Sequence, residues 1–254
     1  MRCRTDHFDL LLLHNPDERG YTSEAVWQGM AAVKSEGLTG KLGIAPGPAN
    51  GFTFDMIQCF CQFHEVIDWA MIILNPLEPW PGSLVLPAAA EHDIKILTRV
   101  VDYGGLFYGD VRPGHVFKPG DHRTFRPAGW VDHGWEKIVR MKKIADRHGL
   151  TLIQFACLWN LAQPAVKNVI PTFIQEAGDD MPMIEQKIRD VASMPALPPF
   201  TMEEMEEIRT LGDNTGCMAL KGASRRHATS DRPDEWAMRS DLELLNEQIG
   251  RAHV

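Results

Sequence analysis

The chain has 254 residues, 44% of them hydrophobic, so it is long enough to fold around a sizeable core. Its net charge of −8 argues against a nucleic acid or an anionic membrane surface as partner. No stretch reaches the roughly 18 apolar residues of a membrane span, and the five cysteines lack disulfide or zinc spacing. We therefore expect a cytoplasmic protein with reduced thiols and a small-molecule ligand.

The first predicted element is a strand at residues 9–14, where an apolar run without alternation ends at Asn15. A helix is predicted next at 23–36, with Ser23 as its N-cap and Gly37 as its stop. The same patterns predict further strands at 41–45, 69–74, 94–99 and 168–171. Further helices are predicted at 53–64, 84–92, 134–148, 150–162, 182–193 and 201–211.

Strands that alternate with helices predict an α/β fold with one parallel sheet, helices outside it and the strands in sequential order. A long stretch at 102–132, rich in glycine and proline, is predicted to be a functional loop. Residues 213–254 are polar and irregular apart from a short helix near 240–249. We expect this C-terminal tail to pack on the outside of the fold.

Several segments resemble, in order, those of the aldo-keto reductase family. Residues 4–16, RTDHFDLLLLHNP, resemble the family's strand that ends in a catalytic histidine. Further similar segments follow in the family's order at 33–44, 73–77, 144–159, 169–171 and 200–211. The resemblance implies that residues 1–212 form an incomplete TIM-type (β/α) barrel of five parallel strands. It also implies NADP-dependent reduction of a carbonyl group in an aldehyde, ketone or sugar.

His14 ends the first predicted strand, at the edge where parallel α/β folds assemble their chemistry. Taken by itself, a single histidine at a strand end is more often structural than catalytic. In the family that His14 resembles, the strand-terminal histidine polarises the substrate carbonyl, so we predict that His14 is catalytic. We expect its ring to face a pocket shared with residues near Asn75 and Arg99.

The family's catalytic aspartate, tyrosine and lysine belong to its first three βα units, which have no counterpart in this chain. The segments around Tyr21, Tyr103 and Tyr108 do not resemble the family's tyrosine motif. The family's polar contacts to the nicotinamide correspond to Ala45, Pro46 and Met71 here, which cannot replace them. We therefore expect impaired reductase activity in this chain.

The resemblance also marks five candidate cofactor-binding residues. Arg99 corresponds to the aromatic residue that stacks on the nicotinamide, and a guanidinium can stack or clamp an anion. The others are two glycines of a pyrophosphate-type loop and two residues that follow the last strand, namely Gly104, Gly105, Pro171 and Thr172. Turn geometry explains the glycine pair about as well. Glu176 stands where the family has basic residues and disfavours a phosphate.

Two alternatives to an impaired reductase remain open at this point. One is a non-redox barrel enzyme, a lyase or isomerase acting on a sugar-like substrate, with His14 as acid and base and Arg99 as anion clamp. The other is a non-catalytic binding or regulatory module. In each case five strands leave two open sheet edges, which predicts a homo-oligomer or a partner chain that covers them.

Overall fold

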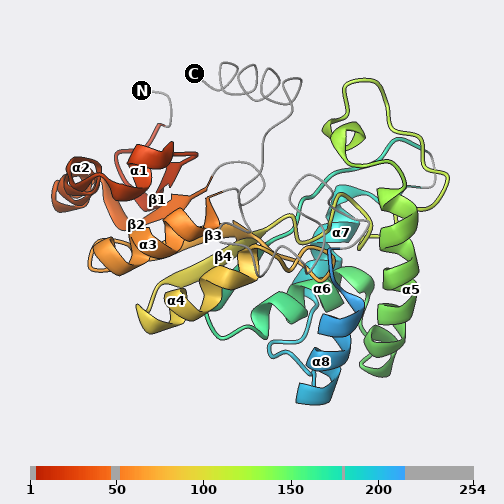
Figure 1. The fold of residues 1–254 in the computed structure, drawn as a ribbon. Helices are drawn as coiled ribbons and strands as arrows, with labels where there is room; N and C mark the ends of the chain where they lie inside the picture. Colours follow the sequence, from red (N-terminus) through yellow and green to blue (C-terminus); the bar gives the residue numbers. More distant parts are fainter. Residues whose placement is uncertain (1–3, 47–51, 179–180, 215–254) are drawn as a thin grey trace.

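The computed structural model describes residues 4–46, 52–178 and 181–214, and it contains one sheet of five parallel strands (Figure 1). The strands follow one another in the order β1-β2-β3-β4-β5. They are β1 (Phe8–His14), β2 (Thr39–Ala45), β3 (Trp69–Ile73), β4 (Lys95–Arg99) and β5 (Val166–Ile170). Each predicted strand is present within about two residues of its expected bounds, and the predicted parallel sheet in sequential order is confirmed.

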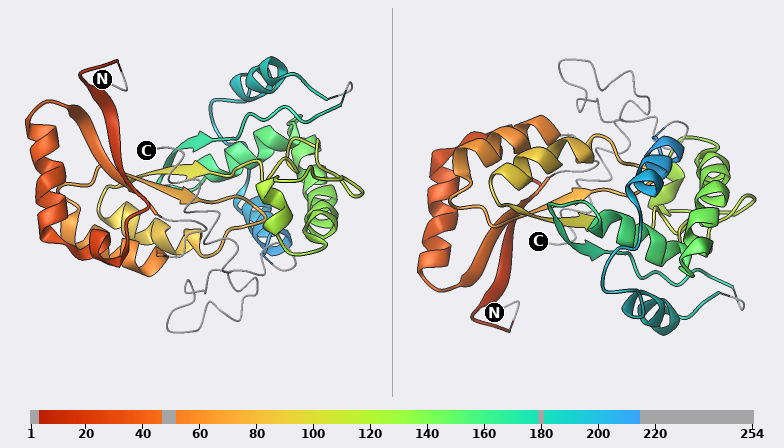
Figure 2. Two further views of the ribbon diagram at one scale, coloured as in Figure 1. Left: turned by 90° about the horizontal axis from the view of Figure 1, so that it is seen from above. Right: turned by 90° about the horizontal axis from the view of Figure 1, so that it is seen from below.

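The helices connect consecutive strands and extend beyond the last one (Figures 1 and 2). The first half of the chain holds α1 (Glu18–Thr22), α2 (Glu24–Ser35), α3 (Thr53–Phe63), η2 (Gly82–Val85) and α4 (Leu86–Glu91). The second half holds η3 (His122–Phe125), α5 (Trp130–Arg147), α6 (Leu152–Leu161), α7 (Ile184–Ala192) and α8 (Met202–Leu211). The predicted helix near 240–249 and nearly all of the predicted tail lie outside the described residues.

The α-helix α1 is additional to the predicted ones, and α5 begins well before its predicted start. The short helix α1 was not expected, and it is capped by Asp17, whose side chain accepts a hydrogen bond from the backbone N–H of Gly20. Helix α5 begins at Trp130 rather than at Gly134, because Gly129 turns the chain with a φ of 79° and Trp130 is buried. The predicted cap of α2 is confirmed, since Ser23 accepts from the N–H of Val26.

The two faces of the sheet differ in their covering. Ile44, Ile72 and Ile96 are fully buried on the face against which the helices pack, where α2 contacts β2 and α4 contacts β4. The opposite face corresponds to the interior of a closed barrel, and at β5 it leaves Ile170 44% exposed. The five strands therefore have the covering of an opened barrel: helices cover one side, most completely over β2, β3 and β4, and the other side is incompletely closed.

Strands β1 and β5 each pair with one neighbour within the part of the chain that the structure describes. Near β1, Phe8 and Leu38 are 40% and 44% exposed. Beyond β5, Phe173 and Ile174 are 37% and 40% exposed. Both edges thus combine unpaired backbone groups with apolar side chains, the combination that additional strands or a partner would cover.

The long loop after β4 is packed rather than extended. Four of its apolar side chains are buried, namely Tyr103, Leu106, Phe107 and Val111. Arg126 lies over the rings of Tyr103 and Trp130, at 4.4 and 4.8 Å from their centroids. Among the described helices, none is long and apolar enough to cross a membrane.

Candidate active site

His14 is the last residue of β1, at the C-terminal end of the strand, and its side chain is exposed. The strand stops there because Asn15 has a φ of 47°, which turns the chain away, while its N–H still donates to the carbonyl of Ala45. Among the described residues, the side chain of His14 has no hydrogen-bond partner. Its ring is therefore accessible to a ligand and is not buried in the helix layer.

His14 and Arg99 lie on the same face of the sheet. Paired residues of neighbouring strands share a face, and so do residues two apart in one strand. When the paired residues are followed from β1 through β2 and β3 to β4, His14 and Arg99 fall on one face. Since β1 and β4 are three strands apart, the two side chains start about 14 Å from each other along the sheet. They can contact one ligand from opposite sides, but they do not form a pair.

Arg99, which ends β4, is only partly exposed. Burial lowers the pKa of its guanidinium, and the negative charge of the buried Glu78 opposes that shift. The positive charge at this position is thus balanced from within the protein. The aligned family position is aromatic, so Arg99 offers a charged plane where a nicotinamide ring would stack.

Asn75, just beyond β3, holds the sheet edge together. Its side-chain oxygen accepts from the N–H groups of Leu77 and Glu78, both at 2.9 Å, and its amide nitrogen donates to the carbonyl of Val100 at 3.0 Å. The side chain is fully buried. Asn75 therefore links the loops after β3 and β4, and its polar atoms are committed to that task.

The glycine pair after β4 serves a turn. Gly104 and Gly105 have φ values of 66° and 97°, and a Cβ at Gly105 would lie 2.9 Å from Val111. The carboxylate of Asp102 accepts from the N–H of Gly105 and from that of Thr172, both at 3.0 Å. Asp102 thus connects two of the predicted cofactor-binding positions, in the loops that follow β4 and β5.

A buried arginine forms the strongest connection between these two loops. Arg123 is 5% exposed, and its guanidinium donates to Glu176 at 2.5 and 3.1 Å. It also donates to Asp121, at 2.6 Å in the shortest contact, and to the carbonyl of Gly104 at 3.1 Å. One cation is therefore shared by two carboxylates and a carbonyl, in a bidentate arrangement that is typical of strong arginine pairs.

A second buried ion pair lies beside the first. Lys187 of α7 contacts the carboxylate of Asp110 and the carbonyl of Ile174, and both charged side chains are 3% exposed. Its ammonium also lies 4.5 Å from the ring centroid of Tyr108. The hydroxyl of Tyr108 is buried without a partner among the described residues, and burial raises its pKa. That hydroxyl is a weaker acid than an ordinary tyrosine.

The electrostatics of the arginine cluster favour its ionised form. The hydrogen bonds from Arg123 lower the pKa of Asp121 to about 2 and also lower the pKa of Glu176. Burial by itself would lower the pKa of Arg123, but its bonds to the two carboxylates raise it above the ordinary value. The cluster is thus a closed set of counter-charges at neutral pH.

The loops after β4 and β5 form the predicted phosphate-binding region, and they offer little room or free charge for the phosphates of NADP. Pro171 is buried, and the Thr172 N–H is already bonded to Asp102. The cavity enclosed by the two loops measures about 10 Å³, room for at most about one water molecule. The cations Arg123 and Lys187 are neutralised by carboxylates. In this conformation the residues present do not fit the phosphates of a dinucleotide.

The network was missed in the sequence, apart from the unfavourable charge of Glu176. Lys187 carried a usable signal, because it lies on the apolar stripe of its helix, three residues after Ile184 and four before Val191. A charged residue in such a stripe predicts a buried ion pair. Arg123 lies in a polar loop and gave no comparable signal.

Cys59 and Cys157 are buried, and burial raises the pKa of each thiol to about 12, so neither is a nucleophile.

Five parallel strands in sequential order with helices outside them are the architecture of a partial (β/α) barrel. The family model described as "Aldo/keto reductase family" matches residues 1–211, and the chain belongs to that family.

Individual relatives are distant. The chain is 24% identical over 217 residues to a probable voltage-gated potassium channel subunit beta of Arabidopsis thaliana, covering 82% of this chain and 63% of the relative. A glycerol dehydrogenase from Gluconobacter oxydans has a TM-score of 0.65 at 20% identity, covering 83% of this chain and 60% of that one. An aldo-keto reductase from Klebsiella pneumoniae, solved with NADP and acetate, has a TM-score of 0.55 at 15% identity, covering 83% and 61%.

The chain thus spans less than two thirds of the length of these relatives. At such identities the solved structures establish the shared fold. The five strands are a portion of the family's barrel.

Proposed function

We propose that this protein is a carbonyl oxidoreductase of the aldo-keto reductase type, acting on a small aldehyde, ketone or sugar, and that His14 is a catalytic residue. The observation that carries the proposal is the position of His14, exposed at the C-terminal end of a parallel strand within a family match over residues 1–211. In the protonated state, an imidazole N–H of His14 can donate to the carbonyl oxygen and stabilise charge that develops there.

In this proposal, the described residues bind the carbonyl oxygen of the substrate through His14. NADP is the cofactor that the family resemblance implies, and a nicotinamide would supply the hydride. Ala45 and Met71 offer no polar side-chain atoms to it, and the loops that would meet its phosphates are closed by Arg123 and Lys187. The proposal therefore includes impaired reductase activity in this chain, and we derive no hydride-transfer step from these residues.

The open sheet edges support a further part of the proposal. We expect three more βα units to pair with β1 and β5, supplied by a different partner chain or by a covalently linked segment. Such units carry the family's aspartate, tyrosine and lysine, and they would complete the site around His14. A cytoplasmic location also belongs to the proposal.

The closed loops favour a second candidate, a non-catalytic binding or regulatory module of the same family. Two buried ion pairs occupy the phosphate region, as expected if selection for cofactor binding has been lost. In that case His14 would be a solvent-exposed residue without a catalytic role.

A chimera separates the two candidates. The first three βα units of the Gluconobacter oxydans glycerol dehydrogenase would be fused ahead of Arg4 and tested for NADPH-dependent aldehyde reduction. We expect slow turnover, because the loops held by Arg123 and Lys187 must open for the cofactor, and we expect it to fall toward background in His14→Ala, while His133→Ala, an exposed histidine of α5, retains it. A folded chimera without turnover, or turnover indifferent to His14, would favour the binding module.

A further inference from the structure

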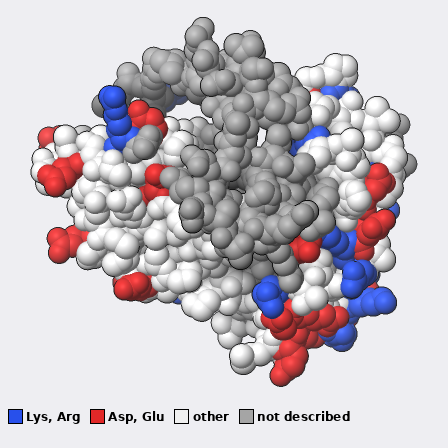
Figure 3. Space-filling model, in the orientation of Figure 1, with Lys and Arg blue, Asp and Glu red and all other residues white. Residues whose placement is uncertain are grey.

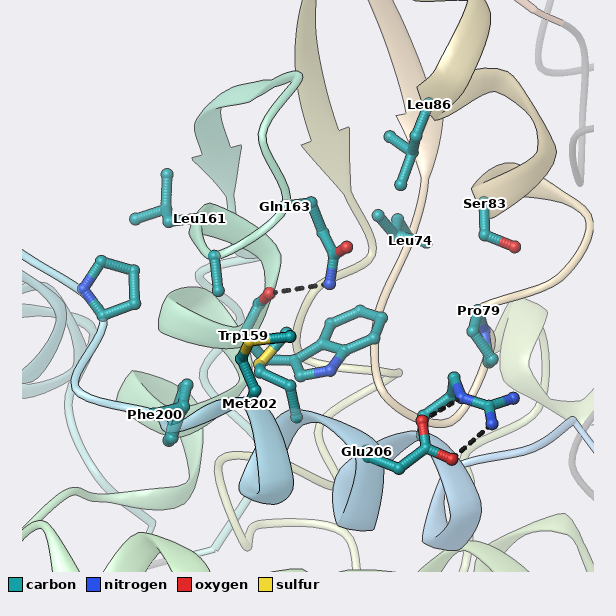
Figure 4. Close-up of a pocket in the computed structure, with 14 residues that line it drawn as sticks. Leu74, Pro79, Ser83, Leu86, Trp159, Leu161, Gln163, Phe200, Met202 and Glu206 are labelled. Carbon is teal, nitrogen blue, oxygen red and sulfur yellow. Dashed lines mark hydrogen bonds and ion pairs between the residues drawn. The ribbon is translucent and has the colours of Figure 1, made fainter. Parts of the chain in front are cut away.

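A cavity of about 680 Å³ lies outside the proposed active site, between the loop after β3, the end of α6 and the helix α8. Its volume falls within the range of small-molecule sites, about 300 to 1,000 Å³. The walls are mainly apolar and come from segments far apart in the sequence, including Leu74, Leu86, Trp159, Leu161, Phe200 and Met205. Figure 4 shows the indole of Trp159 across the middle of the cavity, with Leu86 on one side and Phe200 on the other.

Trp159 is the central group of this cavity. It is only 5% exposed, yet among the described residues its ring N–H has no hydrogen-bond partner. That N–H is not one of the fully buried donors without a partner, so it is open to the cavity that Trp159 lines and is available to a ligand. A ligand that carries an acceptor oxygen would satisfy it.

Two further polar atoms line the same cavity. The hydroxyl of Ser83 and the side-chain oxygen of Gln163 have no protein partner within the described part of the chain, although the amide nitrogen of Gln163 donates to the carbonyl of Trp159 at 3.4 Å. Few polar groups on apolar walls are typical of sites that orient a small ligand.

The rim carries both a charge pair and an apolar side chain. Arg209 donates to Glu206 at 2.7 and 2.5 Å, but both side chains are about 60% exposed, so the pair is worth little and can be exchanged. Met202 is 86% exposed at the same opening. An anionic group on a ligand could replace Glu206 beside Arg209, while its apolar body covers Met202.

We propose that this cavity, centred on Trp159, binds a small molecule with a flat apolar body and an oxygen acceptor or carboxylate. The indole stacks on the flat body or donates its N–H to the acceptor, Ser83 and Gln163 fix the orientation, and Arg209 receives a carboxylate. Since Trp159 lies in the helix layer and His14 on the opposite face of the sheet, this site is separate from the proposed carbonyl site.

The test uses 1-naphthoate as probe and the full chain labelled with 5-fluorotryptophan. The chain has seven tryptophans, and Trp159→Phe identifies the fluorine signal of residue 159 by its loss. We expect this one signal to shift saturably with naphthoate. No shift of the Trp159 signal, or equal shifts of several signals without saturation, would overturn the proposal.

Two variants extend the test. Ala162→Phe places a ring in the cavity and should abolish the shift, while Val139→Phe, at an exposed apolar position on α5, should leave it unchanged. If Ala162→Phe does not fold, Gln163→Leu at the partly exposed rim should weaken binding about tenfold, whereas unchanged binding would contradict the proposed role of Gln163. Retention of the shift in a folded Ala162→Phe would place naphthoate elsewhere and refute the site.

Discussion

Arg123 and Glu176 join the loop after β4 to the loop after β5 through two hydrogen bonds, of 2.5 and 3.1 Å, from a buried guanidinium to a partly buried carboxylate. Asp121 holds the same guanidinium from within the first loop. The three residues thus fix the relative position of the two loops that, in the family resemblance, would surround the cofactor phosphates. A structural role for this cluster leads to consequences that can be measured.

Replacing the buried arginine should strongly destabilise the fold. In Arg123→Met, two partly buried carboxylates, 18% and 10% exposed, lose their cation, and breaking a buried pair from one side costs at most about 3 to 5 kcal/mol. The free energy of unfolding, measured by urea denaturation, should fall by up to this amount. Arg209→Met is the matched control, because its pair with Glu206 is exposed and such pairs contribute about 0 to 1 kcal/mol. Equal losses in the two variants would contradict the assigned role of Arg123.

Stability should also depend on pH through the same cluster. The pKa of Asp121 is lowered to about 2 and that of Glu176 is lowered as well, whereas unfolded carboxyls titrate near 4. Their contribution is therefore complete above about pH 5 and is lost as the pH falls toward 2.

Urea denaturation at a series of pH values should show a decrease over this range. The double variant Asp121→Asn, Glu176→Gln should show a shallower slope, since neither replacement titrates. A wild-type slope in that variant would assign the acid sensitivity to other carboxyls.

The strands could be predicted from the sequence, whereas the ion pairs between the loops could not, because the two depend on different kinds of contact. A strand such as β1 is an unbroken apolar run that ends at a turn residue, so its signal is local. The contacts of Arg123 with Glu176 and of Lys187 with Asp110 join residues 53 and 77 positions apart, and local patterns carry no information on such pairs.

The position of His14 was predictable because a parallel strand has a defined C-terminal end. The electrostatic environment of Arg99 was not predictable, since the negative charge that balances its guanidinium comes from Glu78 in the loop after the neighbouring strand.

A glycine of the sheet should be irreplaceable. A Cβ at Gly43 in β2 would lie 2.3 Å from the carbonyl oxygen of Trp69 and 2.6 Å from Leu12, so Gly43→Ala must displace a neighbouring strand. Overpacking of this kind costs about 1 to 3 kcal/mol.

Gly29→Ala provides the control, because nothing lies within 4 Å of its Cβ position in helix α2. It should gain about 0.5 to 1 kcal/mol from helix propensity. Thermal unfolding of both variants checks the pair, and a stable Gly43→Ala would mean that the spacing of β1, β2 and β3 is wrong.

The chain by itself should show no efficient NADPH-dependent carbonyl reduction. A general acid contributes about a hundredfold to ten-thousandfold, and neither loop tyrosine is suited to the role, because the ring of Tyr103 is fully buried and the hydroxyl of Tyr108 is a weakened acid. Turnover with a panel of aldehydes should stay near background, and His14→Ala, Tyr103→Phe and Tyr108→Phe should not lower it further. Robust turnover in the wild type that His14→Ala or Tyr108→Phe abolishes would show that the described residues do assemble a working acid. It would also require the loops held by Arg123 and Lys187 to open for the cofactor, which saturable quenching of tryptophan fluorescence by NADPH would reveal independently.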